Sequence, residues 1–311
     1  QAETDSDEFG YERLEAADVS PAPMGDMFDR LRDEAGDGEN RLLSHFLSHP
    51  SLSDRIEAAR AAGEIATSFK GKTARRWDKP DDAGPVTEAD IAVNDMLETR
   101  LLAARPGYGW LSEETADTPE RLSRERVFIV DPIDGTRSFV EGHDTWAHAL
   151  AVTEKGRVTA GVVYLPKRGL LYSAALGQGA FLNGAPIRPT EQGDLDEAEI
   201  LAARPVTDAM HWHGPSAPVF RRAYRPSLAW RMALVAEGRF DGMLTLRPCW
   251  EWDVAAGEII LREAGALCTD RTGAACRFNN EVPLVPGLLA GSPTVHDGLR
   301  RALMPPSPAA P

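Results

Sequence analysis

Long apolar runs and cysteines are both scarce in this sequence. No stretch approaches eighteen consecutive apolar residues, so we predict no membrane span. The acidic N-terminus has no basic segment followed by an apolar one, and we therefore expect no signal peptide. The three cysteines, Cys249, Cys268 and Cys276, are odd in number and lack metal-finger spacing. They predict reduced thiols in a cytoplasmic protein, packed as small apolar side chains.

Basic residues are also few, and the negative charge is unevenly placed. Residues 1–40 hold thirteen Asp and Glu against three Lys and Arg, and so carry −10 of the net charge of −14. The rest of the chain is mildly acidic and offers no basic face. This distribution argues against a nucleic acid polymer as a partner. The apolar content of 42% and the charged content of 26% are those of a globular protein.

The apolar pattern divides the chain into three parts. Residues 1–50 are polar and acidic, which predicts a poorly ordered extension with one short helix at Leu42–Leu47. Residues 51–192 mix helical and strand-like segments and predict an α+β half. Residues 193–311 alternate strands with helices and predict an α/β half.

Local signals place the individual elements. One helix is expected to begin at Ser51 or Ser53, and a second is capped by Thr87, which puts Asp90 in its first turn. The apolar run Val127–Val130 is typical of a strand buried on both faces. Further strands are predicted at Tyr108–Leu111, Ala147–Thr153, Val158–Tyr164, Leu170–Ala174, Ala180–Leu182, Ile200–Ala203 and Gly242–Leu246, and further helices at Arg137–Glu141, Ser227–Glu237 and Val254–Ala264, the last of them ended by Gly265.

The segment Asp-Pro-Ile-Asp-Gly-Thr begins at Asp131, directly after the buried strand. Two carboxylates three residues apart, Asp131 and Asp134, are costly at such a position unless a charge compensates them. A hard divalent cation such as Mg²⁺ would do so. Gly135 lets the backbone approach a ligand closely, and Thr136 opens a short helix whose N–H groups could meet a phosphate. The alternative is that both aspartates merely form a turn.

Carboxylates elsewhere in the sequence add to this motif. Glu113 and Glu114 end another strand-like segment, and Asp253 stands between Trp252 and a well-formed helix. Taken separately, neither feature requires a functional role, because paired surface glutamates are common and Asp253 could be an N-cap. The seven histidines, His143 and His148 among them, lack metal-ligand spacing and are expected to be structural or surface residues.

Four motifs together resemble the series that marks the inositol monophosphatase superfamily. They are Thr-Glu-Ala-Asp at 87–90, Ser-Glu-Glu at 112–114, Asp-Pro-Ile-Asp-Gly-Thr at 131–136 and Trp-Asp-Val-Ala-Ala-Gly at 252–257. The resemblance extends from about Leu52 to about Leu299. It implies a layered αβαβα sandwich, of mixed α+β and α/β class, with the active site between the two halves. It also implies a phosphomonoesterase that needs two or three Mg²⁺ ions and is inhibited by Li⁺.

The resemblance also implies which residues hold the metals. The first metal would be held by Glu113, Asp131 and the Ile133 carbonyl. The second would be held by Asp131, Asp134 and Asp253. Oxygen ligands of this kind suit Mg²⁺.

A third, weaker metal and the attacking water involve the neighbouring motifs in this resemblance. The third metal would use Glu113, with Asp90 reached through water. Gly135 and Thr136 would offer backbone N–H groups to the phosphate, and Thr136, linked to Asp90, would orient and deprotonate a water for in-line attack. No cysteine or histidine is placed as a nucleophile, which favours direct hydrolysis.

The substrate remains open at this point. The Ser-Glu-Glu motif, Leu234–Gly238 and Asn279–Gly291 resemble the bacterial 3′(2′),5′-bisphosphate nucleotidases, which act on adenosine 3′,5′-bisphosphate. Inositol-selective members place a carboxylate seven residues before the Trp-Asp aspartate, and this chain has Leu246 there. The adjacent Arg247 could meet a second phosphate instead. Ser227, preceded here by a proline in place of the usual glycine, is a further candidate for contacting substrate.

Three alternatives stand beside the nucleotidase. Inositol-1-monophosphatase is the first, and Arg137 and Trp146 resemble the histidinol-phosphatase branch, which is the second. A non-catalytic interaction protein on the same fold is the third. Trp250 and Trp252 could stack on a base, although tryptophans are more often core residues. The expected partner is a small phosphate ester, with no membrane partner and with a homodimer possible.

Overall fold

The computed structural model describes residues 50–78 and 84–305. The predicted acidic extension and the short helix at Leu42–Leu47 therefore lie outside the described residues, apart from Pro50. Pro50 begins the first described helix, α4 (Pro50–Ser68), slightly before the expected start. Proline suits such a position, because it has no N–H group to lose in the first turn.

The second helix, α5 (Glu88–Ala104), is capped as the sequence predicts. The Thr87 side chain accepts hydrogen bonds from the N–H groups of Ala89 and Asp90, while the Asp90 carboxylate accepts one from the Thr87 N–H. This reciprocal capping box satisfies N–H groups that a helix start otherwise leaves unpaired. It also fixes Asp90, which is fully buried, in a single orientation.

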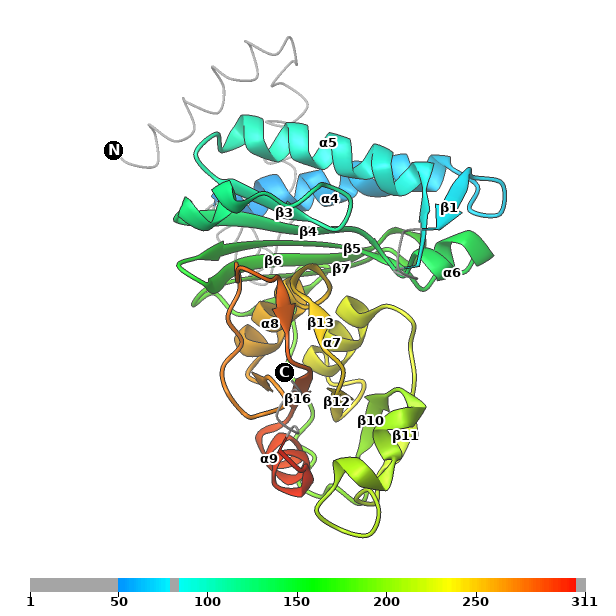
Figure 1. Cartoon of the computed structure of the whole chain (residues 1–311), viewed down its shortest axis with the longest axis vertical. Coiled ribbons are helices and arrows are strands. Elements are labelled where there is room, and N and C mark those ends of the chain that lie inside the picture. Colours follow the sequence, from blue (N-terminus) through cyan, green and yellow to red (C-terminus); the bar gives the residue numbers. More distant parts are fainter. Residues whose placement is uncertain (1–49, 79–83, 306–311) are drawn as a thin grey trace, which may run out of the picture. The chain divides into compact units, whose positions relative to one another are not determined.

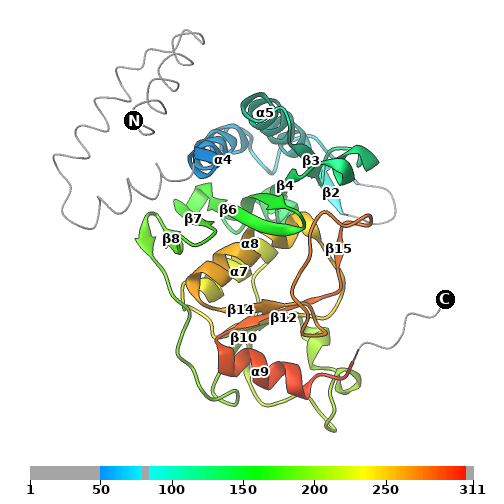
Figure 2. The ribbon, with the colours of Figure 1, turned by 90° about the vertical axis from the view of Figure 1, so that its left-hand side faces the viewer.

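A seven-stranded sheet forms the layer beneath α4 and α5 (Figures 1 and 2). Its strand order is β3-β4-β5-β6-β7-β8-β9, and every pair is antiparallel except β3 with β4. A two-stranded ribbon of β1 (Arg76–Asp78) and β2 (Pro85–Thr87) leads into α5. The sheet strands are β3 (Gly109–Ser112), β4 (Arg126–Asp134), β5 (Ala147–Glu154), β6 (Arg157–Leu165), β7 (Leu170–Ala175), β8 (Ala180–Leu182) and β9 (Ala185–Pro186).

Two helices lie between this sheet and a second one (Figures 1 and 2). They are α7 (Leu228–Ala236) and α8 (Glu251–Ala264), and α8 ends at Gly265 in the left-handed conformation, as predicted. The second sheet has the order β11-β10-β12-β16-β14, and α9 (Pro293–Ala302) packs beyond it. Its strands are β10 (Glu199–Ala202), β11 (Arg221–Ala223), β12 (Gly242–Thr245), β14 (Leu267–Thr269) and β16 (Leu288–Gly291), with a separate ribbon of β13 (Cys249–Trp250) and β15 (Leu284–Val285). The layering is αβαβα, which confirms the predicted fold.

Close approach between the two middle helices depends on a glycine. A Cβ atom placed on Gly257 of α8 would lie 2.6 Å from the Cβ of Met232 on α7 and 2.5 Å from its sulfur. Both helices are buried between the sheets, so neither can move away without disturbing the core. The interhelical distance is therefore set by the missing side chain at position 257.

We predict that Gly257→Ala lowers the melting temperature. Alanine has the better helix propensity by about 1 kcal/mol, but the clash with Met232 should cost roughly 1–3 kcal/mol. Gly193→Ala is the control, because no described heavy atom lies within 4 Å of its Cβ position. Thermal unfolding followed by circular dichroism should show a drop for the first variant only. Equal melting temperatures would contradict the close packing of α7 on α8.

Candidate metal centre

A bulge in β4 brings two aspartates to the same side of the chain. Residues three apart on a regular strand point to opposite faces. In β4, Asp131 pairs with Ala149 and Asp134 with Ala147, so β4 has one more residue than β5 between these pairs. Pro132 lies in this irregular stretch, where its lack of an N–H group costs the sheet no hydrogen bond. The extra residue turns both carboxylates toward the same space.

A histidine on the neighbouring strand, β5, holds the bulge in place. The ring Nδ1 of His148, on β5, is hydrogen-bonded to the Pro132 carbonyl oxygen. His148 is fully buried, and burial lowers its pKa to about 4, so the ring is neutral at physiological pH and Nδ1 carries the proton. Beyond the bulge, Gly135 adopts a left-handed φ of 99° and begins α6 (Thr136–Glu141). His148 thus supports the bulge through its hydrogen bond to the Pro132 carbonyl.

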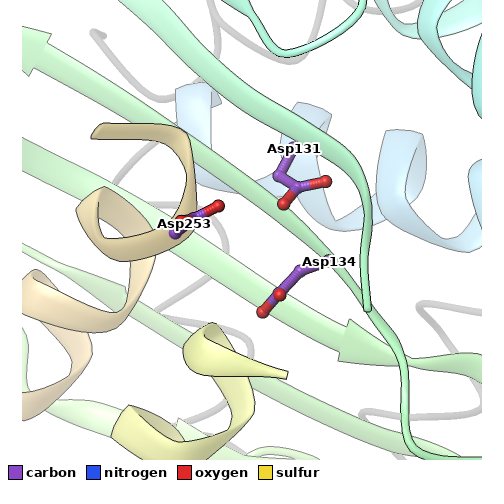
Figure 3. A group of neighbouring side chains, drawn as sticks. All are labelled: Asp131, Asp134 and Asp253. Carbon is purple, nitrogen blue, oxygen red and sulfur yellow. The ribbon is translucent and has the colours of Figure 1, made fainter. Parts of the chain in front are cut away.

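Asp131, Asp134 and Asp253 converge on one small space (Figure 3). One oxygen from each carboxylate lies within 4.8 Å of those of the other two. Burial, followed by the charges of neighbouring carboxylates, raises the pKa of Asp131 and of Asp253. Oδ1 of Asp131 is buried and has no hydrogen-bond partner among residues 50–78 and 84–305. An orphaned carboxylate oxygen facing two other carboxylates fits a hard divalent cation.

Asp134 is shared between this cluster and the start of α7. Its Oδ2 accepts hydrogen bonds from the Ser227 hydroxyl at 2.6 Å and from the Ala229 N–H at 2.7 Å, and its Oδ1 accepts a longer one from the Leu228 N–H at 3.3 Å. Burial raises the pKa of Asp134, and these hydrogen bonds oppose that shift. Oδ1 thus keeps room for a cation.

Ser227 has a different position from the one predicted. We expected it to contact substrate, but it is fully buried. Its hydroxyl donates to Asp134 and accepts the N–H of Trp230, which caps α7. Ser227 therefore holds Asp134 and the helix start together, and its side chain does not face an open cleft.

Glu113 reaches the cluster through β3 and β4, the one parallel strand pair of the seven-stranded sheet. Ser112 of β3 lies opposite Val130 of β4, and the Glu113 N–H continues the pairing to the Val130 carbonyl at 3.3 Å. Glu113 therefore lies alongside Asp131, and it is half-buried. Its charge is among those that raise the pKa of Asp131 and Asp253, after the effect of burial.

Thr136 and Asp90 form a buried pair beside the cluster. The Thr136 hydroxyl lies 3.0 Å from Oδ1 of Asp90 and 3.0 Å from the Ile133 carbonyl oxygen, and its single hydrogen can be given to either one. Burial raises the pKa of Asp90 to about 6, against the opposing effect of its hydrogen bonds. The carboxylate can therefore accept a proton near neutral pH.

Leu246 is buried in the structure. Counting back from Asp253 placed Leu246 where a carboxylate would face sugar hydroxyls. Its side chain instead packs in the apolar cluster of the second sheet and is 8% exposed. Leu246 thus offers no hydrogen-bond acceptor to a sugar hydroxyl, and its effect on substrate choice stays a prediction.

Two arginines lie near the cluster, and only one of them was predicted from the sequence. Arg247 is exposed, and its charge lowers the pKa of Asp253 against the larger effects of burial and of other carboxylates. The missed residue is Arg231, a buried arginine of α7 whose charge acts on both Asp134 and Arg247. An arginine within the apolar stretch Leu-Ala-Trp-Arg-Met-Ala-Leu was the available signal.

The remaining aromatic candidates differ in exposure. Trp250 and Trp252 are stacked, with ring centroids 4.8 Å apart, and Trp250 is 43% exposed. Trp146 is buried against Phe139 and His148 and is a core residue. Arg137, next to the phosphate motif, is exposed.

Comparisons with known proteins agree with this architecture. The model of the inositol monophosphatase family matches residues 49–305. Nus factor SuhB of Escherichia coli K12 is 33% identical over 259 residues, which are 79% of this chain and 93% of that protein. Inositol-1-monophosphatase of Mesorhizobium japonicum is 32% identical over 71% of this chain and 83% of that protein. The Thermotoga maritima IMPase structure superimposes with a TM-score of 0.70 at 28% identity, over 81% of this chain and 96% of that one.

The chain belongs to the inositol monophosphatase family. Its fold is the one that these relatives share. In the part of the chain that the structure describes, no helix is long and apolar enough to cross a membrane.

We predict that Mg²⁺ stabilises the protein through this cluster. A raised carboxylate pKa means that stability is lost as the pH rises through the folded-state pKa, so ionised Asp131 costs stability at neutral pH. In EDTA at neutral pH, Asp131→Asn should melt at or above the wild-type temperature. A cation at one hundred times its Kd should stabilise the wild type by about 2.7 kcal/mol.

The variant should lose most of this Mg²⁺-dependent gain. Asp196→Asn, an exposed residue away from the cluster, is the control and should keep the full gain. A thermal shift that is equal in all three proteins would show that Mg²⁺ acts elsewhere.

Proposed function

We propose that this protein is a magnesium-dependent phosphomonoesterase that hydrolyses a small phosphate ester. The observation that carries the proposal is the convergence of Asp131, Asp134 and Asp253 beside the Thr136–Asp90 pair. Neither group alone defines a hydrolase. Together they supply cation ligands and a buried acceptor for the proton of a water molecule.

The proposed mechanism assigns a task to each group of the chain. Glu113, the three aspartates and the Ile133 carbonyl would hold two Mg²⁺ ions, with a third, weaker ion near Glu113 and Asp90. When bound, Mg²⁺ neutralises phosphoryl oxygens and stabilises the leaving alkoxide. The N–H groups of Gly135 and Thr136 would receive the phosphoryl group. The Thr136 hydroxyl would accept a proton from the attacking water while giving its own to Asp90.

We infer that the preferred substrate carries a second anionic group. Arg247 is exposed at the edge of the cluster, and the buried Arg231 adds a positive charge behind it. A second phosphate would form charge-assisted hydrogen bonds with the Arg247 guanidinium. Adenosine 3′,5′-bisphosphate is such a compound, and the exposed ring of Trp250 could receive its base. The inositol-1-monophosphatase relatives make inositol 1-phosphate the competing substrate.

A phosphate-release panel tests this proposal. It compares adenosine 3′,5′-bisphosphate, inositol 1-phosphate and histidinol phosphate, each with Mg²⁺, with Mg²⁺ plus Li⁺, and with EDTA. We expect release with Mg²⁺ alone, inhibition by Li⁺, and the highest kcat/KM for the bisphosphate. Full turnover in EDTA would overturn the mechanism. A higher kcat/KM for inositol 1-phosphate would overturn the substrate assignment and leave the metal centre in place.

A non-catalytic role is the second candidate, because some relatives are named Nus factor SuhB. Such a role does not require ionised ligands at the cluster. Asp131→Asn would then keep the protein's biological effect while abolishing phosphate release. Complementation of a deletion strain with this variant separates the two functions.

We predict that Thr136→Ala lowers kcat by roughly 10²–10⁴-fold, the range for a lost acid–base group. The matched variant Thr136→Ser keeps a hydroxyl and should retain most of the activity. Initial rates at saturating Mg²⁺ and substrate measure the effect. If Thr136→Ala turned over as fast as the wild type, the hydroxyl would have no part in moving the proton.

We predict that Arg247→Ala raises KM for adenosine 3′,5′-bisphosphate. A lost charge-assisted hydrogen bond should cost roughly 1.5–3 kcal/mol, whereas KM for a simple monophosphate should scarcely change. Arg126→Ala is the control, because Arg126 is exposed at the other end of β4 and pairs with Glu154. Equal effects on both substrates would remove Arg247 from substrate selection.

A further inference from the structure

A cavity lies apart from the candidate metal centre. It has a volume of about 290 Å³, and none of the proposed metal ligands lines it. Arg271 and Thr272 come from the turn after β14, Arg300 and Arg301 from the last turn of α9, and His213 from the segment before β11. The cavity thus gathers three arginines from two segments and a histidine from a third.

The positive charge in this cavity is poorly compensated. No carboxylate is among the described residues that line it. Arg300 has no ion pair with any described residue, and Arg301 has only an exposed one with Asp297 at 3.7 Å. The nearest carboxylate in sequence to Arg271 is that of Asp270, which accepts hydrogen bonds from the Thr272 N–H, the Thr272 hydroxyl and the Ala274 N–H. Two arginines without an ion pair to a described residue, beside a third that has only an exposed one, are unusual in a chain of net charge −14.

Arg271 is held in place before any ligand arrives, and the stem of the exposed Arg300 contacts the turn after β14. Nη1 of Arg271 donates to the Leu246 carbonyl oxygen at 3.0 Å, and its Nε is buried without a partner among the described residues. The stem of Arg300 lies over Gly273, where an added Cβ would come within 2.8 Å of its Cδ. An immobilised guanidinium group such as that of Arg271 loses little conformational entropy when it binds an anion.

The wall of the cavity is fixed as well. The His213 N–H donates to the Ala302 carbonyl at 2.9 Å, and the Met304 N–H donates to the His211 carbonyl at 2.9 Å. These two hydrogen bonds flank the pairing of Trp212 with Leu303. The segment that carries His213 is therefore tied to the end of α9 that carries Arg300 and Arg301.

We propose that this cavity binds a small phosphorylated anion. Planar guanidinium groups match the paired oxygens of a phosphate, and three of them suit a diphosphate or the phosphate of a nucleotide. A volume of about 290 Å³ is at the lower end for ligand sites, so the bound group is small. Because its residues lie outside the metal centre, this site does not depend on the proposed catalytic function.

Titration calorimetry in EDTA tests the proposal. Without Mg²⁺ the catalytic cluster is a group of carboxylates and repels anions, so anion binding there is suppressed. Inorganic pyrophosphate and AMP are titrated separately into the full chain. We expect saturable one-to-one binding that weakens as salt is added. Tighter binding of pyrophosphate would identify a free inorganic anion as the ligand class, and tighter binding of AMP would identify a nucleotide phosphate.

Variants then locate the binding. Arg300→Gln should weaken it roughly tenfold, and Arg300→Gln with Arg301→Gln should weaken it further. Arg239→Gln, an exposed arginine paired with Glu237 at 3.7 Å, is the control. Arg300→Gln should keep the wild-type phosphatase rate with Mg²⁺, which separates this site from the catalytic one. No binding by the wild type, or equal binding by Arg300→Gln and Arg239→Gln, would overturn the proposal.

Discussion

The packing of the first sheet on the helical layer depends on how the mutual repulsion among buried carboxylates is compensated. Asp131, Asp134 and Asp253 come from two elements, β4 and α8, and each needs a partner for its charge. At the start of α7, the Ser227 hydroxyl and two backbone N–H groups compensate part of the charge of Asp134 by donating hydrogen bonds to it. The first sheet is thereby joined to the helical layer by the same carboxylate that faces the candidate cation site. The hydrogen bonds that compensate the charge of Asp134 are therefore also the ones that hold β4 against the start of α7.

Much of the fold could be predicted from local sequence signals. Thr87 as a helix cap, the apolar strand at Val127–Val130 and the terminating Gly265 each depend on residues within one turn or one strand. The motif at Asp131 indicated its chemistry for a similar reason, because carboxylates after a buried strand are costly without compensation. Family resemblance added the partners that lie far away in sequence, such as Asp253.

Orientation was harder to predict, because it depends on register and packing. Counting residues placed Leu246 in a substrate pocket, but its side chain packs in the second sheet's apolar cluster. Ser227 was expected to contact substrate, whereas its hydroxyl donates to Asp134, 93 residues earlier in the chain. Arg231 was not predicted as a site residue, because apolar residues surround it in the sequence of α7. In each case the decisive contact joins segments that no local pattern connects.

The bulge in β4 also has a consequence for how such a sequence can change over time. Because side chains alternate along a strand, the cluster depends on an odd–even count that the bulge shifts by one. Deleting a single residue between Asp131 and Asp134 would restore a regular ladder with both carboxylates still on one face, yet it would remove one of the two backbone carbonyls, those of Pro132 and Ile133, that His148 and Thr136 contact. Substitutions at Pro132 or Ile133 can be absorbed one at a time, but changes of length cannot. The number of residues between Asp131 and Asp134 is therefore constrained separately from the identity of those residues.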